Sequence, residues 1–410
     1  MWGCPVGLSM AERAAVTREL AARYRRASKS GKSAILDELC ELTGWHRDHA
    51  RRALRTVSAR PPGPRRKPVR RPRAPKYDEA VLTALRVAWA VLDAPCGKRL
   101  APVLPQLIAA LEAHGELALS DQQRTALGRI SPATIDRRLA GDRKAMTLKG
   151  RSGTKPGGLL KHQIPIRTFA DWDEDRPGFA EIDLVGHEGG NPRGEFAQTL
   201  TLTDVHCGWT ESQAVRNKAQ RWVFEGLLEV RRRLPFPLLG LDSDNGAEFI
   251  NAHLLRYCTE QQITFTRARS NRKNDNCFVE QKNWAVVRRA VGYLRYDTDD
   301  EVAVLNELYS HLRLLTNFFS PQAKLLSKER VGAKVRKRYD TPATPYQRLL
   351  ADPNIPPKTK KQLKATYATL NPAQLRRDVR RCQQHLVDLA KTKTIQAQEE
   401  VKPPQASGHS

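Results

Sequence analysis

Between residues 179 and 290, three acidic residues lie in or at the ends of apolar segments, and this restricts what the stretch can fold into. Asp183 lies in FAEIDLVGH, Asp244 follows the apolar run in LLGLDSDNG, and Glu280 lies in NCFVEQKNW. An unpaired carboxylate in an apolar setting is costly, so something must compensate its charge. Divalent cations shared by the three carboxylates would do so, because Mg²⁺ prefers carboxylate oxygens.

The segments around these acids alternate between strand and helix patterns from about residue 171. FAEIDLVGH and the two halves of FAQTLTLTDVHCGWTESQAV predict an antiparallel meander with a turn at Cys207-Gly208. PLLGLDSD and ITFTRA predict further strands, and each follows a helical pattern, NKAQRWVFEGLLEVRRRL and AEFINAHLLRYCTEQQ respectively. This order predicts a mixed sheet with helices on both faces. Ligands in such sheets collect at the carboxyl ends of strands, where Asp244 is expected.

The first part of the chain, residues 10–56, predicts helices with apolar residues at three- and four-residue steps. A helix over AILDELCEL, a turn at Thr43-Gly44 and a basic second helix with Arg47, Arg51 and Arg52 match the helix-turn-helix pattern. An ordinary helical hairpin with a solvated basic face matches it as well. The stretch that follows favours DNA binding, because residues 57–76 contain eight basic residues, six prolines and no acid. We expect an extended linker that tracks a phosphate backbone.

Residues 77–145 again predict helices, one of them beginning at Ser131-Pro132. Arg137 and Arg138 are expected on its outer face. A second DNA-binding unit and a purely structural bundle both fit this pattern.

The charge balance favours a polyanionic partner. The chain has 70 Lys and Arg against 44 Asp and Glu, a formal charge of +26 and a pI of about 10.1. Nucleic acid is the commonest such partner, and an anionic membrane surface is the alternative. We expect no membrane span, because no run of 18 apolar residues occurs, and no secretory signal, because the start of the sequence lacks a basic region followed by an apolar block. Seven scattered cysteines without CxxC spacing favour a reducing compartment, so we expect a cytoplasmic protein.

Four features occur in a fixed order. A strand carries Asp183, a small turn and His187; D-N-G is followed by Glu248-Phe249; 35 residues separate Asp244 from Glu280; and a helix reads V-E-Q-K-N. Residues 171–295 thereby resemble the catalytic domain of retroviral integrases and of bacterial insertion-sequence transposases, the D,D-35-E class. The helix-turn-helix pattern and the NFFSP segment are similar to what insertion-sequence members carry around that core.

The resemblance implies an RNase H-like mixed-sheet core within a multidomain α and α/β protein. It implies a DNA transposase that binds its element's terminal repeats and catalyses metal-dependent strand cleavage and strand transfer into target DNA. Asp183 would bridge two Mg²⁺ ions (Mn²⁺ is the alternative), while Asp244 and Glu280 would each hold one. A homo-oligomer in a synaptic complex is implied as well. The alternatives are a DNA-binding regulator or domesticated protein with an inactive core, and an RNase H-like nuclease that does not join strands.

Other residues near the three acids have more than one interpretation. Glu181 and Asp242 share strand faces with Asp183 and Asp244, and we expect them beside the site rather than in it. Asp204 is expected to be structural, whereas His187 either lines the pocket or caps its strand, and Asn245 either orients a carboxylate or makes the turn. The residues expected to contact DNA are Arg47, Arg51, Arg52, Arg65, Arg66, Lys67, Arg70, Arg71, Arg137, Arg138, Lys273, Asn274, Lys282, Arg288 and Arg289.

Two departures from the family pattern are visible. The His/His/Cys/Cys zinc domain of retroviral integrases is missing from the sequence, and Val286 and Val287 stand where members commonly carry Lys. The expected organisation is a helix-turn-helix domain (10–56), a basic Pro/Arg linker (57–76), a second helical DNA-binding domain (77–145), a linker (146–170), the integrase-like core (171–295), a basic C-terminal region with helices (300–393) and a disordered tail (394–410).

Overall fold

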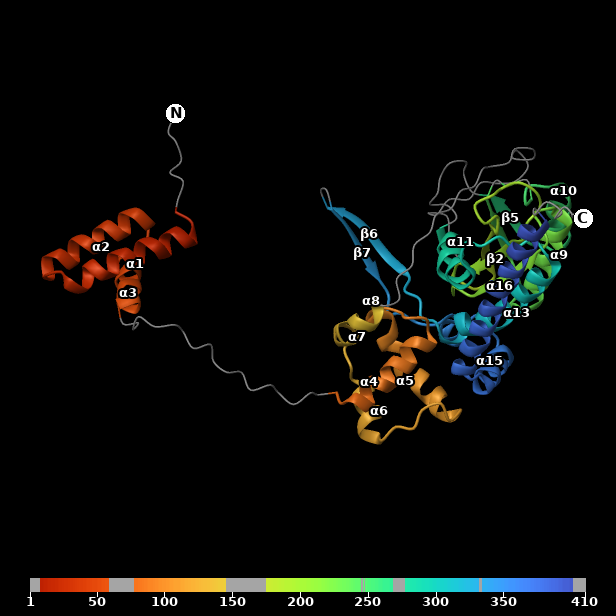
Figure 1. Cartoon of the computed structure of the whole chain (residues 1–410), viewed down its shortest axis with the longest axis horizontal. Helices are drawn as coiled ribbons and strands as arrows, with labels where there is room; N and C mark the ends of the chain where they lie inside the picture. The colour runs from red at the N-terminus through yellow and green to blue at the C-terminus, as the bar shows by residue number, and fades with distance from the viewer. Residues whose placement is uncertain are drawn as a thin grey trace, which may run out of the picture. The chain divides into compact units, whose positions relative to one another are not determined.

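The computed structural model describes residues 8–58, 77–144, 175–244, 246, 248–267, 277–331 and 334–400. The chain divides into two compact units, Met1–Pro75 and Lys76–Ser410, and each is described by itself (Figure 1). Most of the expected linker 57–76, the connector 146–170 and the loop before Glu280 lie outside the described residues.

The first unit consists, in its described part, of helices α1 (Met10–Arg26), α2 (Lys29–Thr43) and α3 (Arg47–Ser58). Ser9 and Glu12 form a capping box at the start of α1, which satisfies backbone donors that the helix cannot. Helix α2 ends at Gly44, whose φ of 68° lies in the left-handed region that favours glycine. The apolar faces meet in a small core of Leu20, Ala21, Ile35, Leu36, Leu39, Ala50 and Leu54. The predicted helices of residues 10–56 are therefore confirmed.

The second unit contains, in its described part, a five-stranded sheet of β1 (Phe179–Gly186), β2 (Gln198–Asp204), β3 (Thr210–Val215), β4 (Gly240–Ser243) and β5 (Thr264–Arg267), in the order β3-β2-β1-β4-β5. The pairs β1–β2 and β2–β3 are antiparallel, whereas β1–β4 and β4–β5 are parallel. The meander, the turn at Cys207-Gly208 and the mixed sheet of the expected α/β core are confirmed.

Helices α9 (Gln220–Arg232) and α10 (Ala252–Glu260) connect strands β3 to β4 and β4 to β5. Their apolar side chains, among them Val223, Leu227 and Leu254, share a core with Ile182 and Leu241 of the sheet. Helix α10 begins later than the pattern AEFINAHLLRYCTEQQ predicted. The reason is the Asn251 side chain, which accepts a hydrogen bond from the Leu254 N–H at 2.8 Å and so caps the helix.

Helix α13 (Asp299–Leu314) and the π-helical segment η3 (Leu315–Phe319) cover the edge strand β3. The Asn317 side chain accepts from the Thr210 N–H and donates to the Thr210 carbonyl, both at 2.8 Å. Asn306 does the same for Ala214, at 2.7 and 3.1 Å. These amides take the place of a further strand, so the edge of the sheet keeps its backbone groups paired.

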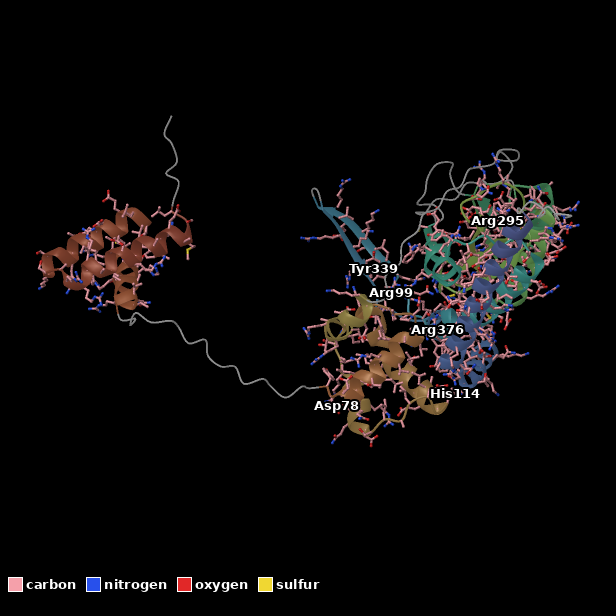
Figure 2. The ribbon with its side chains drawn as sticks, viewed as in Figure 1. Asp78, Arg99, His114, Arg295, Tyr339 and Arg376 are labelled. Atoms are coloured by element: carbon pink, nitrogen blue, oxygen red, sulfur yellow. The ribbon has the colours of Figure 1, made fainter. Side chains whose placement is uncertain are left out.

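Residues 77–144 form α4 (Glu79–Val91), α5 (Gly97–Ala113), α6 (Asp121–Gly128), α7 (Pro132–Arg138) and α8 (Ala140–Lys144). They pack into one hydrophobic core with α13, α14 (Pro345–Ala351), α15 (Pro357–Thr369) and α16 (Pro372–Glu400). Arg376 of α16, labelled in Figure 2, donates to the Val91 carbonyl of α4 at 2.7 Å. The core therefore joins the region expected as a separate helical domain to the C-terminal region. Helix α16 also extends into the tail expected to be disordered, as far as Glu400.

Strands β6 (Leu325–Val331) and β7 (Lys334–Tyr339) pair antiparallel as a separate two-stranded sheet. Among the described helices, none is both long and apolar enough to cross a membrane.

The pairing of Asn317 with Thr210 leads to a stability prediction. Asn317→Ala leaves the buried N–H and C=O of Thr210 without partners, at about 1–3 kcal/mol for each group. We expect urea unfolding, followed by tryptophan fluorescence, to show a loss of unfolding free energy of about 2–6 kcal/mol. The exposed Gln362→Ala on α15 is the control and should stay within about 0.5 kcal/mol of the wild type. Equal stability of the two variants would show that the amide is not needed at this edge.

Candidate active site

Glu181 and Asp183 point to the same face of the sheet, because side chains alternate along strand β1 and Ile182 between them enters the core with α9 and α10. Helix α11 (Cys277–Lys282) and the π-helical segment η2 (Asn283–Arg288) lie over that face. The first candidate acid and the helix that carries the third are thereby brought together.

Glu181 fixes the beginning of α11. Its side chain is fully buried, and its Oε2 accepts a hydrogen bond from the Val279 N–H at 2.8 Å. The first N–H groups of a helix have no partner within the helix, and a carboxylate suits their positive end. Burial raises the pKa of Glu181 well above its ordinary value, and the charges of Asp242 and Glu280 add to this. Glu181 therefore holds the residue next to Glu280 against strand β1.

Asp183 is the most enclosed of the three candidate acids. Its oxygens accept from the Leu184 N–H at 2.8 Å and from the Asn283 side-chain amide at 2.6 Å. Burial, followed by the negative charges of Asp244 and Glu280, raises its pKa to about 8. The carboxyl of Asp183 is thus close enough to both other acids for their charges to oppose its ionisation.

Asp244 directly follows strand β4, the parallel neighbour of β1. The register pairs Ile182 with Ser243, so the residues that follow them are neighbours, with Asp183 in the middle of β1 and Asp244 just past the end of β4. The Gly246 N–H donates to Asp244 at 2.9 Å, and burial raises the pKa of Asp244. Asp244 therefore lies at the carboxyl end of a strand, as predicted.

Glu280 lies in α11 with an exposed side chain, and its charge raises the pKa values of both Asp183 and Glu181. Among the described residues, however, no three His, Cys, Asp or Glu side chains lie close enough together to hold a metal ion. The three acids therefore form an electrostatic cluster whose carboxylates do not converge on one point.

The donor types nevertheless suit a hard divalent cation. The candidate ligands are carboxylate oxygens, which Mg²⁺ prefers. Beside Asp183, the Oδ1 atom of Asn283 is buried and has no hydrogen-bond partner among the described residues. A cation bound here would coordinate this unpaired oxygen. It would also offset the negative charges that oppose ionisation of the Asp183 carboxyl.

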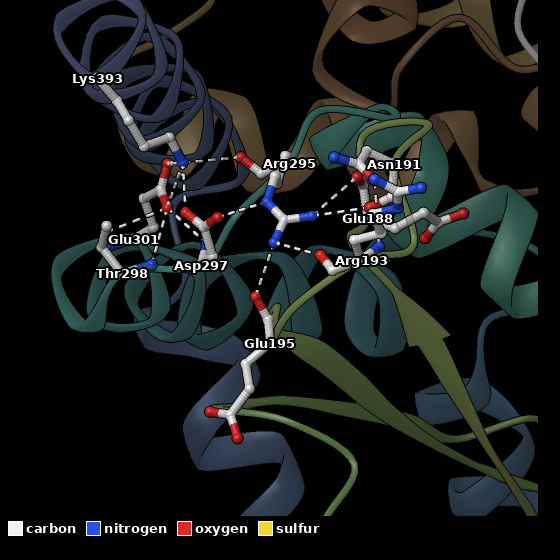
Figure 3. A network of polar contacts seen from close by, with 9 residues as sticks. All are labelled: Glu188, Asn191, Arg193, Glu195, Arg295, Asp297, Thr298, Glu301 and Lys393. Atoms are coloured by element: carbon white, nitrogen blue, oxygen red, sulfur yellow. Dashed lines mark hydrogen bonds and ion pairs between the residues drawn. The ribbon is translucent and has the colours of Figure 1, made fainter. Parts of the chain in front are cut away.

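The loop that follows β1 is held by a guanidinium group (Figure 3). Arg295 donates to the carbonyls of Asn191, Arg193 and Glu195 at 2.8–3.1 Å and pairs with Asp297. Lys393 of α16 pairs with the same aspartate at 2.7 Å. The connection between β1 and β2 is thus fastened to the chain that follows the Glu280 helix.

Three of the other weighed residues have structural contacts. His187 is buried, its Nε2 lies 2.7 Å from the Thr199 hydroxyl, and burial lowers its pKa to about 3, so it is neutral. Asp204 accepts from the N–H groups of Cys207 and Gly178, as expected for a turn residue. Asp242 is buried on β4 and accepts from the Thr266 hydroxyl.

The residues expected to contact DNA differ in their exposure and in their contacts within the protein. In the first unit, the Arg52 side chain is exposed, whereas Arg47 pairs with Asp37 and Arg51 with Asp48. Arg137 and Arg138 on α7 line an open pocket of about 310 Å³. Those outside the described residues are Arg65, Arg66, Lys67, Arg70, Arg71, Lys273 and Asn274, as is Asn245.

Near the acids, Arg288 and Arg289 have partners within the protein, and Lys282 is enclosed by it. Arg288 donates to the Gly186 carbonyl at 2.7 Å and lies over the Tyr293 ring. Arg289 pairs with Asp93 at 2.5 Å. Burial and the charge of Arg99 lower the pKa of Lys282 to about 7.

Sequence reasoning did not single out Asn283, although it closes the quoted V-E-Q-K-N. Its position three residues after Glu280 was the available signal, because residues three apart share a helix face. The role of Glu181 as a partner of α11 carried no sequence signal, since it depends on which helix end packs against the strand.

Comparisons with known proteins give three results. No family model matches the chain. Among solved structures, it is similar to the catalytic core domain of BIV integrase, with a TM-score of 0.28 and 18% identity over 42% of this chain and 91% of that one. It is also similar to the HTLV-2 integrase catalytic core domain in complex with magnesium, with a TM-score of 0.27 and 13% identity over 36% of this chain and 90% of that one.

Among curated proteins, the chain is 41% identical over 341 residues to the uncharacterized protein y4rM of Sinorhizobium fredii. The match covers 83% of this chain and 96% of that protein. The chain therefore belongs to the same protein family as y4rM.

Proposed function

We propose that the chain is a DNA transposase with an integrase-like core, which binds the terminal repeats of its element and catalyses metal-dependent strand cleavage and strand transfer. One observation carries the proposal: the register of β1 and β4 places Asp183 beside Asp244, and the helix that carries Glu280 is held over the same strand, so that both charges help to raise the pKa of the half-buried Asp183 to about 8. An acid at the end of the neighbouring strand and an acid on a helix thus both act on the carboxyl of Asp183, and a core with only a structural role has no need of that arrangement.

Asp183, Asp244 and Glu280 are the residues that would hold divalent cations. Bound there, the cations would supply an activated water or DNA 3′-hydroxyl and stabilise the leaving 3′-oxygen. Asn283 would keep the Asp183 carboxylate oriented through its 2.6 Å hydrogen bond. Glu181 would hold α11, and with it Glu280, beside β1 through the Val279 N–H.

The competing function is a DNA-binding regulator whose core does not cut. It is favoured by the exposed Glu280 and by the lack, among the described residues, of three acids within reach of one ion. Binding and strand transfer measured on the same variants separate the two functions, because a regulator binds the element ends without joining them.

The first test replaces the acids. We expect Asp183→Asn, Asp244→Asn and Glu280→Gln each to lower strand transfer more than about 100-fold, because each removes a carboxylate worth several kcal/mol in the transition state. Binding to the element ends should remain. The control is Glu195→Gln, whose carboxylate points away from the Arg295 network in Figure 3 and is exposed. Full activity in any of the three variants would exclude that residue from the site.

The second test measures cation binding through thermal stability, independently of enzyme activity. In EDTA, the folded protein holds a proton on Asp183 up to about pH 8, whereas an unfolded chain releases it near 3.8. This group therefore makes the folded protein less stable as pH rises through that interval, and Asp183→Asn removes the effect. At about pH 9, where this carboxyl of pKa about 8 is ionised, Mg²⁺ should raise the melting temperature of the wild type but not of Asp183→Asn. An equal shift in both proteins would place the cation elsewhere.

The third test concerns the first unit. If α3 contacts DNA, Arg52→Gln should weaken binding to a duplex taken from the DNA that flanks the gene about tenfold, since one specific contact is worth about 1–3 kcal/mol. Arg18→Gln on α1 makes the same charge change at another exposed position and serves as the control. Equal binding by the two variants would contradict a role for α3 in recognition.

A further inference from the structure

The hairpin of strands β6 and β7 is firmly attached at its base (Figure 1). Gln322 and Ala343 exchange backbone hydrogen bonds at 2.9 and 3.1 Å. Asp340 accepts from the Lys324 N–H at 2.7 Å and pairs with Arg348 of α14 at 2.8 Å. The hairpin therefore leaves the second unit from a fixed base.

Beyond this base, the side chains of the hairpin are largely exposed. Residues 325–331 and 334–339, here called the basic ribbon, contain six Lys or Arg and one acid, Glu329. Leu326 is 60% exposed and Val335 46%. Tyr339, labelled in Figure 2, is 40% exposed and has the Lys98 ammonium 5.9 Å from its ring centre. A pair of strands with so little buried surface contributes little stability of its own, which favours a binding role.

The charges of the basic ribbon repel one another. The register places Lys328 directly opposite Lys337, and like charges in that position destabilise a pair of strands. Among the described residues, Lys328, Arg330, Lys337 and Arg338 form no ion pair. A polyanion bound along the ribbon would turn this repulsion into attraction.

Both faces of the basic ribbon are positive. The register places Lys328, Arg330 and Lys337 on one face and Arg336 and Arg338 on the other. An element that docks on a membrane surface would instead separate an apolar face from a basic one. The major groove of duplex DNA admits a two-stranded ribbon and has phosphates along both of its walls. The charge distribution thus fits a groove better than a flat surface.

We propose that the basic ribbon is a DNA-binding element that lies in the major groove of duplex DNA and contacts phosphates on both sides. The proposal rests on the proposed function for the identity of the polyanion as DNA. It adds a contact region far along the chain from the helix-turn-helix pattern and from the three acids.

The test measures binding of the full chain to a fluorescent duplex of arbitrary sequence, in EDTA and over a range of KCl concentrations. One variant combines Lys328→Gln, Arg330→Gln and Lys337→Gln, and a second combines Arg336→Gln and Arg338→Gln. The control combines Lys358→Gln, Lys361→Gln and Lys364→Gln, which removes three charges from exposed positions of α15. Each lost phosphate contact lowers the slope of log K against log salt by about 0.9.

We expect the first variant to bind at least about tenfold more weakly, with a slope lower by about 2–3, and the second to lose about 1–2 in slope. The α15 control should bind like the wild type. Removing the Lys328–Lys337 repulsion should not unfold the hairpin, and a thermal melt checks this.

Four results would overturn the proposal. Wild-type binding by both ribbon variants would exclude DNA contact, and an equal loss in the α15 control would show that only net charge matters. Weaker duplex binding in only one of the two ribbon variants would exclude insertion into a groove, because only one face would then contact DNA. Vesicles containing phosphatidylserine form a separate arm, in which a loss seen with vesicles but not with duplex would assign the ribbon to a membrane. Because no cation or cleavage is involved, failure here is distinct from failure of the transposase proposal.

Discussion

The candidate site depends on one hydrogen bond, from the Val279 N–H at the start of α11 to the buried carboxyl of Glu181 on β1. Helix α11 continues without a break into η2, and the Glu181 carboxyl holds the first turn of this helical stretch against β1. The same strand carries Asp183, and the same short helix carries Glu280. One buried contact therefore determines how near two acids from distant parts of the sequence can come, and Asn283 strengthens it by binding Asp183 from the segment that follows.

Much of the fold could be predicted from the sequence, because period-two alternation and turn residues are local signals. The strands around Asp183, the turn at Cys207-Gly208 and the strand that ends before Asp244 were predicted from such patterns and are present. The start of α10 was placed too early, because the pattern of apolar residues does not include the Asn251 cap. The π-helical form of η2 and η3 also could not be read from the sequence, since the spacing of apolar residues does not distinguish it from an α-helix.

The parts of the site that escaped prediction depend on distant contacts. Arg288 and Arg289 were expected to face DNA because they are basic and follow Glu280, yet they bind Gly186 and Asp93. A charge in a sequence does not reveal whether an acceptor from elsewhere in the chain lies beside it. The same holds for Asn317 and Asn306, whose pairing with an edge strand required knowledge of which helix covers that edge.

The hydrophobic core shared by residues 77–139 and the C-terminal helices has a consequence for how the protein is made. Leu85 and Leu104 are in the same core as Val379 and Leu386, some three hundred residues later in synthesis. While translation is under way, the early helices lack the surface that buries them and expose apolar side chains, which invites aggregation or chaperone binding. The second unit can complete its core only when almost the whole polypeptide has left the ribosome, so prematurely terminated products should be cleared rather than retained as shortened forms.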